Sequence, residues 1–143
     1  FTTIYRSSQY DAEALISIDK NLIIFTKNKL KKITEIYSLP KKAGNFKAKK
    51  IGSIDTKSIV TGADFDKTTN TLALTSTISF NEYYIHVIND FRLKNQNHQI
   101  DTYKIPIGKT QVESIKIIDP KTFWISSEDE SNSSSARLMK VKL

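Results

Sequence analysis

Two glutamates, Glu13 and Glu113, are the best candidates for chemistry in this chain, because they begin similar apolar segments. Asp11, Asp64 and Glu128 could add further carboxylates to them. Ca²⁺ takes six to eight oxygen ligands, many of them from carboxylates. The sequence therefore predicts a ligand-binding group formed by Asp11, Glu13, Asp64 and Glu113. It also nominates Glu13, Glu113 and Glu128 as candidate calcium ligands.

The same carboxylates have a plainer explanation, which the sequence leaves open. Each glutamate could cap backbone N–H groups or pair with a lysine. Gly62 stands at the matching place in the middle segment, so a ring of acids would be incomplete. The segment 64–70 faintly resembles a calcium loop, but it lacks the glycine and the terminal glutamate of such loops. A hairpin turn explains it better.

No catalytic residue is predicted. His86 and His98 are the only histidines, and neither belongs to a metal-ligand spacing or to a recognisable Ser-His-Asp set. We expect His86 within a strand, in the core or a channel wall, and His98 in a loop. The chain has no cysteine, which excludes disulfides and thiolate zinc sites.

The basic charge of the chain does not favour nucleic acid as a partner. The net charge is +7, but of the 22 basic residues only Arg6, Arg92 and Arg137 are arginine. Recognition of bases and phosphates favours the arginine fork. The lysines are spread over turns and strand faces. No apolar run approaches the roughly 18 residues of a membrane span.

An internal repeat organises the chain. Similar segments begin at Asp11, Val60 and Gln111, about 50 residues apart, and each is followed by a second apolar run. Short β-branched and aromatic runs alternate with turn residues throughout, and no segment has a clean helical period. A period of about 40–50 residues with several strands per unit is typical of β-propeller blades. We therefore predict an all-β fold of the β-propeller type.

The expected domain is one β-propeller segment over 1–143, with repeats at about 8–56, 57–106 and 107–143. A strand at 2–6 would belong to an adjoining blade, and a polar loop would precede the last strand. The remaining strands are expected at 13–18, 22–27, 32–38, 47–54, 58–65, 71–76, 82–89, 99–105, 112–118, 122–127 and 136–142.

Three blades cannot close a ring, because closed propellers have about four to eight. The prediction is half of a six-bladed ring. A second chain or a missing N-terminal half would complete it, because an isolated half would expose apolar faces and unpaired edges. The chain is therefore expected not to be a free monomer, with Phe1 as an internal point of a longer protein.

Several motifs together resemble a group of exported β-propeller proteins of Bacteroidetes, especially flavobacteria. They are Asp11-Ala-Glu-Ala-Leu, Leu22-Ile-Ile-Phe-Thr-Lys-Asn, Ile36-Tyr-Ser-Leu-Pro, Val60-Thr-Gly-Ala-Asp-Phe, Gln111-Val-Glu-Ser-Ile and Phe123-Trp-Ile-Ser-Ser-Glu. The resemblance runs from about Tyr10 to Leu143 and matches the C-terminal half of six-bladed members. It implies a secreted, periplasmic or cell-surface location, and no settled activity.

The resemblance and the carboxylates lead to one preferred function and one alternative. The preferred function is a non-catalytic binding or scaffolding module, whose protein or carbohydrate ligand binds at the channel mouth near Glu13 and Glu113. The alternative is a calcium-dependent hydrolase of the lactonase or phosphodiesterase kind. Propellers of that kind place a glutamate of similar local sequence on calcium.

Overall fold

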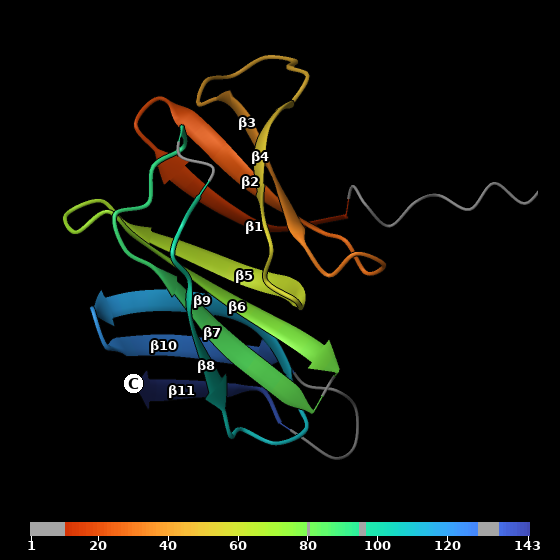
Figure 1. The fold of residues 1–143 in the computed structure, drawn as a ribbon, viewed down its shortest axis with the longest axis vertical. Helices are drawn as coiled ribbons and strands as arrows, with labels where there is room; N and C mark the ends of the chain where they lie inside the picture. The colour runs from red at the N-terminus through yellow and green to blue at the C-terminus, as the bar shows by residue number, and fades with distance from the viewer. Residues whose placement is uncertain (1–10, 80, 95–96, 129–134) are drawn as a thin grey trace, which may run out of the picture.

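The fold consists of β-strands joined by turns and short connections (Figure 1). The computed structural model describes residues 11–79, 81–94, 97–128 and 135–143. The strands are β1 (Asp11–Ile18), β2 (Asn21–Lys27), β3 (Thr34–Pro40), β4 (Lys49–Ile54), β5 (Ile59–Asp66), β6 (Thr71–Ser79), β7 (Glu82–Ile88), β8 (Asp101–Ile105), β9 (Gln111–Asp119), β10 (Thr122–Glu128) and β11 (Arg137–Lys142).

The strand predictions from Glu13 onward are confirmed, each with shifts of a few residues at the ends. Alternation of apolar and polar residues located these strands because one face of each strand packs on a neighbour. The expected strand at 2–6 lies outside the described residues, as does most of the polar loop before the last strand. Within the described ranges there is no helix long and apolar enough to cross a membrane.

The strands form three antiparallel sheets that follow one another along the chain. The orders are β1-β2-β3-β4 in the first sheet, β5-β6-β7-β8 in the second and β9-β10-β11 in the third. The sheets are stacked, with the second between the other two (Figure 1). The first strands of the sheets lie side by side, because β5 contacts both β1 and β9.

Two apolar layers hold the stack together. One joins the first and second sheets, with Phe25 and Leu74 among its fully buried side chains. The other joins the second and third sheets and includes Ile85 and Phe123. The second sheet is therefore covered on both faces. Each outer sheet packs through one face only within the described part of the chain.

A β-bulge recurs near the start of the first strand of every sheet. The bulged residues are Glu13 in β1, Thr61 in β5 and Glu113 in β9, as the strand registers show. A bulge bends its strand and redirects the extra side chain. This repeated irregularity corrects the sequence alignment, in which Gly62 was the counterpart of the two glutamates. Thr61 is the counterpart, because the middle repeat is one residue out of step there.

Gly62 has a packing role of its own. A Cβ atom on Gly62 would lie 2.8 Å from the Thr75 hydroxyl oxygen and 3.0 Å from the Ser114 Cα atom. Both distances are shorter than ordinary contacts. The absence of a side chain therefore allows β5 to approach β9 closely.

The described residues thus form an all-β structure of three similar antiparallel sheets, and they do not form a closed ring. The finer prediction of propeller blades stays a prediction.

Candidate functional site

The first bulge carries a carboxylate that is partly withdrawn from water. Glu13 Oε1 lies 2.8 Å from the Lys27 ammonium, and only about a seventh of the Glu13 side chain is exposed, at 14%. Burial raises the pKa of Glu13, and the negative charges of Asp11 and Glu113 add to the rise. The hydrogen bond and the charge of Lys27 oppose it. The two glutamates predicted from the repeat therefore lie near enough to influence each other.

The third bulge lines a small hollow beside the second sheet. Glu113 Oε1 accepts a hydrogen bond of 2.6 Å from the Gln111 amide. The hollow has a volume of about 140 Å³. It is lined by Lys27, Lys29, Ile59, Thr61, Thr77, Tyr83, Gln111 and Glu113. We call this region, with Glu13 beside it, the bulge mouth. It combines carboxylate, ammonium, amide and hydroxyl groups.

The other predicted residues are placed differently. Asp64 accepts hydrogen bonds from the Lys116 ammonium at 2.7 Å and from the Ile117 backbone N–H at 2.8 Å. Asp64 therefore joins β5 to β9 rather than lining the bulge mouth. Asp11 is exposed opposite Lys27, and Glu128 is exposed opposite Gln111.

The hairpin explanation of residues 66–70 is confirmed. Asp66 accepts hydrogen bonds from the Thr68 backbone N–H at 2.9 Å and from the Thr69 hydroxyl at 2.7 Å. Asn70 has a positive φ of 53°, which asparagine tolerates in tight turns. The carboxylate of Asp66 is thus used by its own turn.

The bulge mouth does not show a metal centre. Among the described residues, no three side chains of the His, Cys, Asp or Glu types are grouped so that they could hold a metal ion. Lys27 also occupies one carboxylate of the mouth. Calcium binding by Glu13, Glu113 and Glu128 stays a prediction. The observed groups are suited to hydrogen bonding and ion pairing with a polar ligand.

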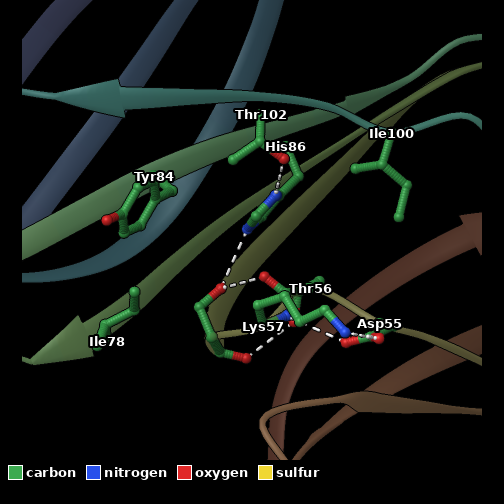
Figure 2. Close-up of a pocket in the computed structure, with 9 residues that line it drawn as sticks. Asp55, Thr56, Lys57, Ile78, Tyr84, His86, Ile100 and Thr102 are labelled. Carbon is green, nitrogen blue, oxygen red and sulfur yellow. Dashed lines mark hydrogen bonds and ion pairs between the residues drawn. The ribbon is translucent and has the colours of Figure 1, made fainter.

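A second hollow lies on the second sheet and was not predicted from the sequence (Figure 2). Its volume is about 300 Å³. It is lined by Asp55, Thr56, Lys57, Ser58, Ile78, Tyr84, His86, Ile100 and Thr102. We call it the His86 hollow. Figure 2 shows Ile100 and Thr102 on one side of His86, and Thr56 with the Asp55–Lys57 pair on the other.

The floor of the His86 hollow is a chain of hydrogen-bonding groups. His86 Nε2 lies 2.6 Å from the Ser76 hydroxyl and 3.2 Å from the Ser58 hydroxyl. His86 Nδ1 lies 2.9 Å from the hydroxyl of Thr102. Ser58 also reaches the Thr56 carbonyl oxygen at 2.9 Å. Ser58, Ser76 and His86 are each at most 1% exposed.

Burial keeps the imidazole neutral. Desolvation lowers the pKa of His86 to about 4, because the charged ring would lose its hydration on burial. A neutral imidazole has one donor and one acceptor nitrogen, and the three hydroxyls next to it suit either tautomer. The serine, histidine and threonine do not form a catalytic triad. Thr102 occupies the position beside Nδ1 that an acidic residue takes in a triad. Ser76 is fully buried, so a substrate cannot reach its hydroxyl.

The sequence predicted the position of His86 in a strand, but it did not predict which residues surround it. Alternation within 82–88 placed His86 inside a strand, and that prediction is confirmed. Its partners come from the connection before β5, from β6 and from β8. Only strand pairing brings them to one place, as in the register of Leu74 with His86 and of His86 with Thr102.

Comparisons with known proteins add no identity to this geometry. No protein-family model matches the chain, and no curated protein or solved structure matches it significantly.

Proposed function

We propose that this chain is part of a β-propeller that serves as a non-catalytic binding or scaffolding module, with its ligand at the bulge mouth. The observation that carries the proposal is the bulge repeated at Glu13, Thr61 and Glu113. Equivalent bulges on adjacent first strands turn equivalent side chains toward the same end of the stack. Loops and strand ends held on a rigid scaffold are common places for binding residues.

The direction of packing supports the propeller proposal. Ile23 in β2 packs toward the second sheet. The register makes Ala73 its counterpart in β6, and Ala73 packs toward the third sheet. Each sheet thus meets the next one through the same face. Such a head-to-tail contact joins two different faces, so each added sheet leaves one face free for another. Repeated addition therefore ends only when a ring closes, or gives a filament.

The faces at the ends of the stack are open and partly apolar. Leu15 is 57% exposed on β1, and Leu138 is 68% exposed on β11. Trp124, on β10, is also exposed. On this proposal, three more sheets of the same type cover these faces and close a six-bladed ring. A second chain or a further part of the same protein would supply them.

The groups of the bulge mouth favour recognition of a polar partner surface, such as a protein loop. Glu113 offers an acceptor, Lys27 a cation and Thr61 a hydroxyl around one hollow. The alternative, a calcium-dependent hydrolase, would use the same carboxylates as ligands. An exported or surface location is part of the proposal and rests on the sequence resemblance.

The test is binding to an array of immobilised peptides and oligosaccharides, with and without CaCl₂, by the unaltered protein and by Glu113→Gln. We expect peptide binding that Glu113→Gln weakens at least tenfold. The control is Asp119→Asn, a carboxylate at a hairpin away from the mouth, which should bind as the unaltered protein does. The proposal is wrong if no peptide binds, or if peptide binding is indifferent to Glu113→Gln. Calcium-dependent hydrolysis of lactones or phosphodiesters that is lost in Glu113→Gln would establish the alternative.

Light scattering tests the propeller part of the proposal separately. Pairing of two copies through the open faces predicts a particle of twice the 16.3 kDa chain mass. Leu138→Lys should shift that particle toward the monomer, whereas Leu30→Lys, in a turn, should not. A well-folded monomer without exposed-face association would contradict ring closure by a second copy.

A further inference from the structure

We propose that the His86 hollow is a binding site for a neutral sugar ring, such as one hexose unit of a glycan. It is separate from the bulge mouth, with no lining residue in common, and it does not depend on the proposed function. Small-ligand sites are typically concave and mostly apolar, with a few polar groups that converge inside. The His86 hollow has each of these features.

The apolar walls come from an aromatic ring and two aliphatic side chains. Tyr84 lies two residues before His86 on β7, and the two rings are nearly parallel, with 22° between their planes. Ile78 and Ile100 complete the apolar part of the lining. Ile78 is 40% exposed although it is a large apolar residue. A pyranose ring has an apolar C–H face that can pack on such walls, particularly on an aromatic ring.

The polar floor ends in a hydroxyl that a ligand can reach. Thr102 is exposed and lies 2.9 Å from His86 Nδ1. When Nδ1 carries the imidazole proton, the Thr102 hydroxyl oxygen accepts a hydrogen bond from this N–H group. The hydroxyl hydrogen of Thr102 is then free to be donated to another acceptor. Ser76 then donates to His86 Nε2. The buried serines therefore orient the imidazole, and the imidazole orients Thr102 toward a ligand hydroxyl.

The charges at the rim select against an ionic ligand. The Lys57 ammonium pairs with Asp55, and hydrogen bonds from Lys57 lower the pKa of Asp55, which keeps it ionised. The rim therefore has one charge of each sign in contact, and the His86 side chain at the floor is neutral near pH 7. A phosphate or carboxylate would be repelled by the Asp55 carboxylate, and the lysine in the lining, Lys57, is already paired with Asp55. A neutral, hydroxyl-rich ligand meets no such cost.

The hollow also has the right size. A volume of about 300 Å³ lies at the lower end of the range of roughly 300–1,000 Å³ for small-molecule sites. It therefore fits one sugar ring better than an extended cofactor. Because one ring offers few contacts, affinity for a monosaccharide should be weak and that for an oligosaccharide higher.

The test is a titration of the ¹⁵N-labelled full chain followed by two-dimensional NMR. The probes are the methyl glycosides of glucose, galactose, mannose and N-acetylglucosamine, each up to 50 mM, at pH 7. We expect at least one probe to shift the amide signals of Ser58, Tyr84 and Thr102 in a saturable way. Tyr84→Leu and Thr102→Val should each weaken that binding at least fivefold.

Matched variants make the result decisive. Tyr103→Leu changes an exposed tyrosine on the opposite face of β8 and should leave sugar binding unchanged. Glu113→Gln should also leave it unchanged, so failure at the bulge mouth and failure here can be told apart. The inference is overturned if no probe shifts these signals, or if Tyr103→Leu weakens binding as much as Tyr84→Leu. The amide spectrum of each variant shows whether it is folded.

Discussion

The bulge mouth and the His86 hollow both gather polar side chains, but they do so at different depths. Glu13 is partly buried and remains beside a cation, Lys27. His86 is 1% exposed, and its hydrogen-bond partners among the described residues are hydroxyl groups. Removing a charge from water is costly unless a partner compensates for it. The mouth therefore keeps the partly buried Glu13 beside a cation, whereas the floor of the hollow holds neutral groups.

Because of this difference in burial, the two sites are suited to different kinds of ligand. The mouth can offer charge, because its carboxylates and ammonium remain partly hydrated. The hollow can offer oriented hydroxyl groups and apolar walls, because His86 at its floor is held in its neutral form. The contrast predicts different effects of acid and of substitutions at the two sites.

Acid should destabilise the fold through His86. Its pKa is about 4 in the folded protein and near the ordinary value of about 6.5 in the unfolded chain. The unfolded chain therefore binds more protons between these values, so stability is complete above about pH 6.5 and falls as the pH drops toward 4. The expected loss is about 3 kcal/mol, measured by urea unfolding at several pH values.

The control for this prediction is His86→Gln, which keeps hydrogen-bonding groups but cannot titrate in this range. Its stability should be lower at pH 7 and should vary less between pH 6.5 and 4. An equal slope in the unaltered protein and in His86→Gln would contradict the assignment of the effect to His86.

Gly62→Ala should have the next largest effect. The added methyl group would press on the Thr75 hydroxyl and on the Ser114 backbone, where β5 approaches β9 beside the mouth. Overpacking of this kind costs about 1–3 kcal/mol, measurable as a lower midpoint in urea. Ser114→Ala alters the matching position of the third sheet, where a Cβ is already present, and should cost clearly less. Equal stability of Gly62→Ala and the unaltered protein would mean that the close approach is not needed.

Lys27→Met should have the smallest effect on stability and a clear effect on charge. Removing the ammonium removes the influence that lowers the pKa of Glu13, so burial should raise that pKa further. Because the pair is partly exposed, the change in the free energy of unfolding should be about 1 kcal/mol or less. NMR titration of the Glu13 carboxyl carbon measures the pKa. Lys67→Met, which removes an exposed pair with Asp19, should leave the Glu13 value as it is.

Local patterns predicted the strands well. Alternation in Glu82–Ile88 and the turn residues at 66–70 report on neighbours in the chain, and the structure confirms both. The counterpart of the two glutamates was predicted less well. The apolar pattern placed Gly62 there, whereas the strand register places Thr61. A bulge shifts pairing by one residue, and apolar periodicity does not reveal on which residue the shift falls.

The sequence by itself determined the all-β class and the repeat of similar strand groups, because these follow from the alternation and spacing of residues along the chain. Only the tertiary structure decided that Asp64 bonds to β9 and that Ser58, Ser76 and Thr102 converge on His86. Those contacts join residues from different strands, and strand pairing and sheet stacking determine which of them meet. Burial then determines which of them carry a charge.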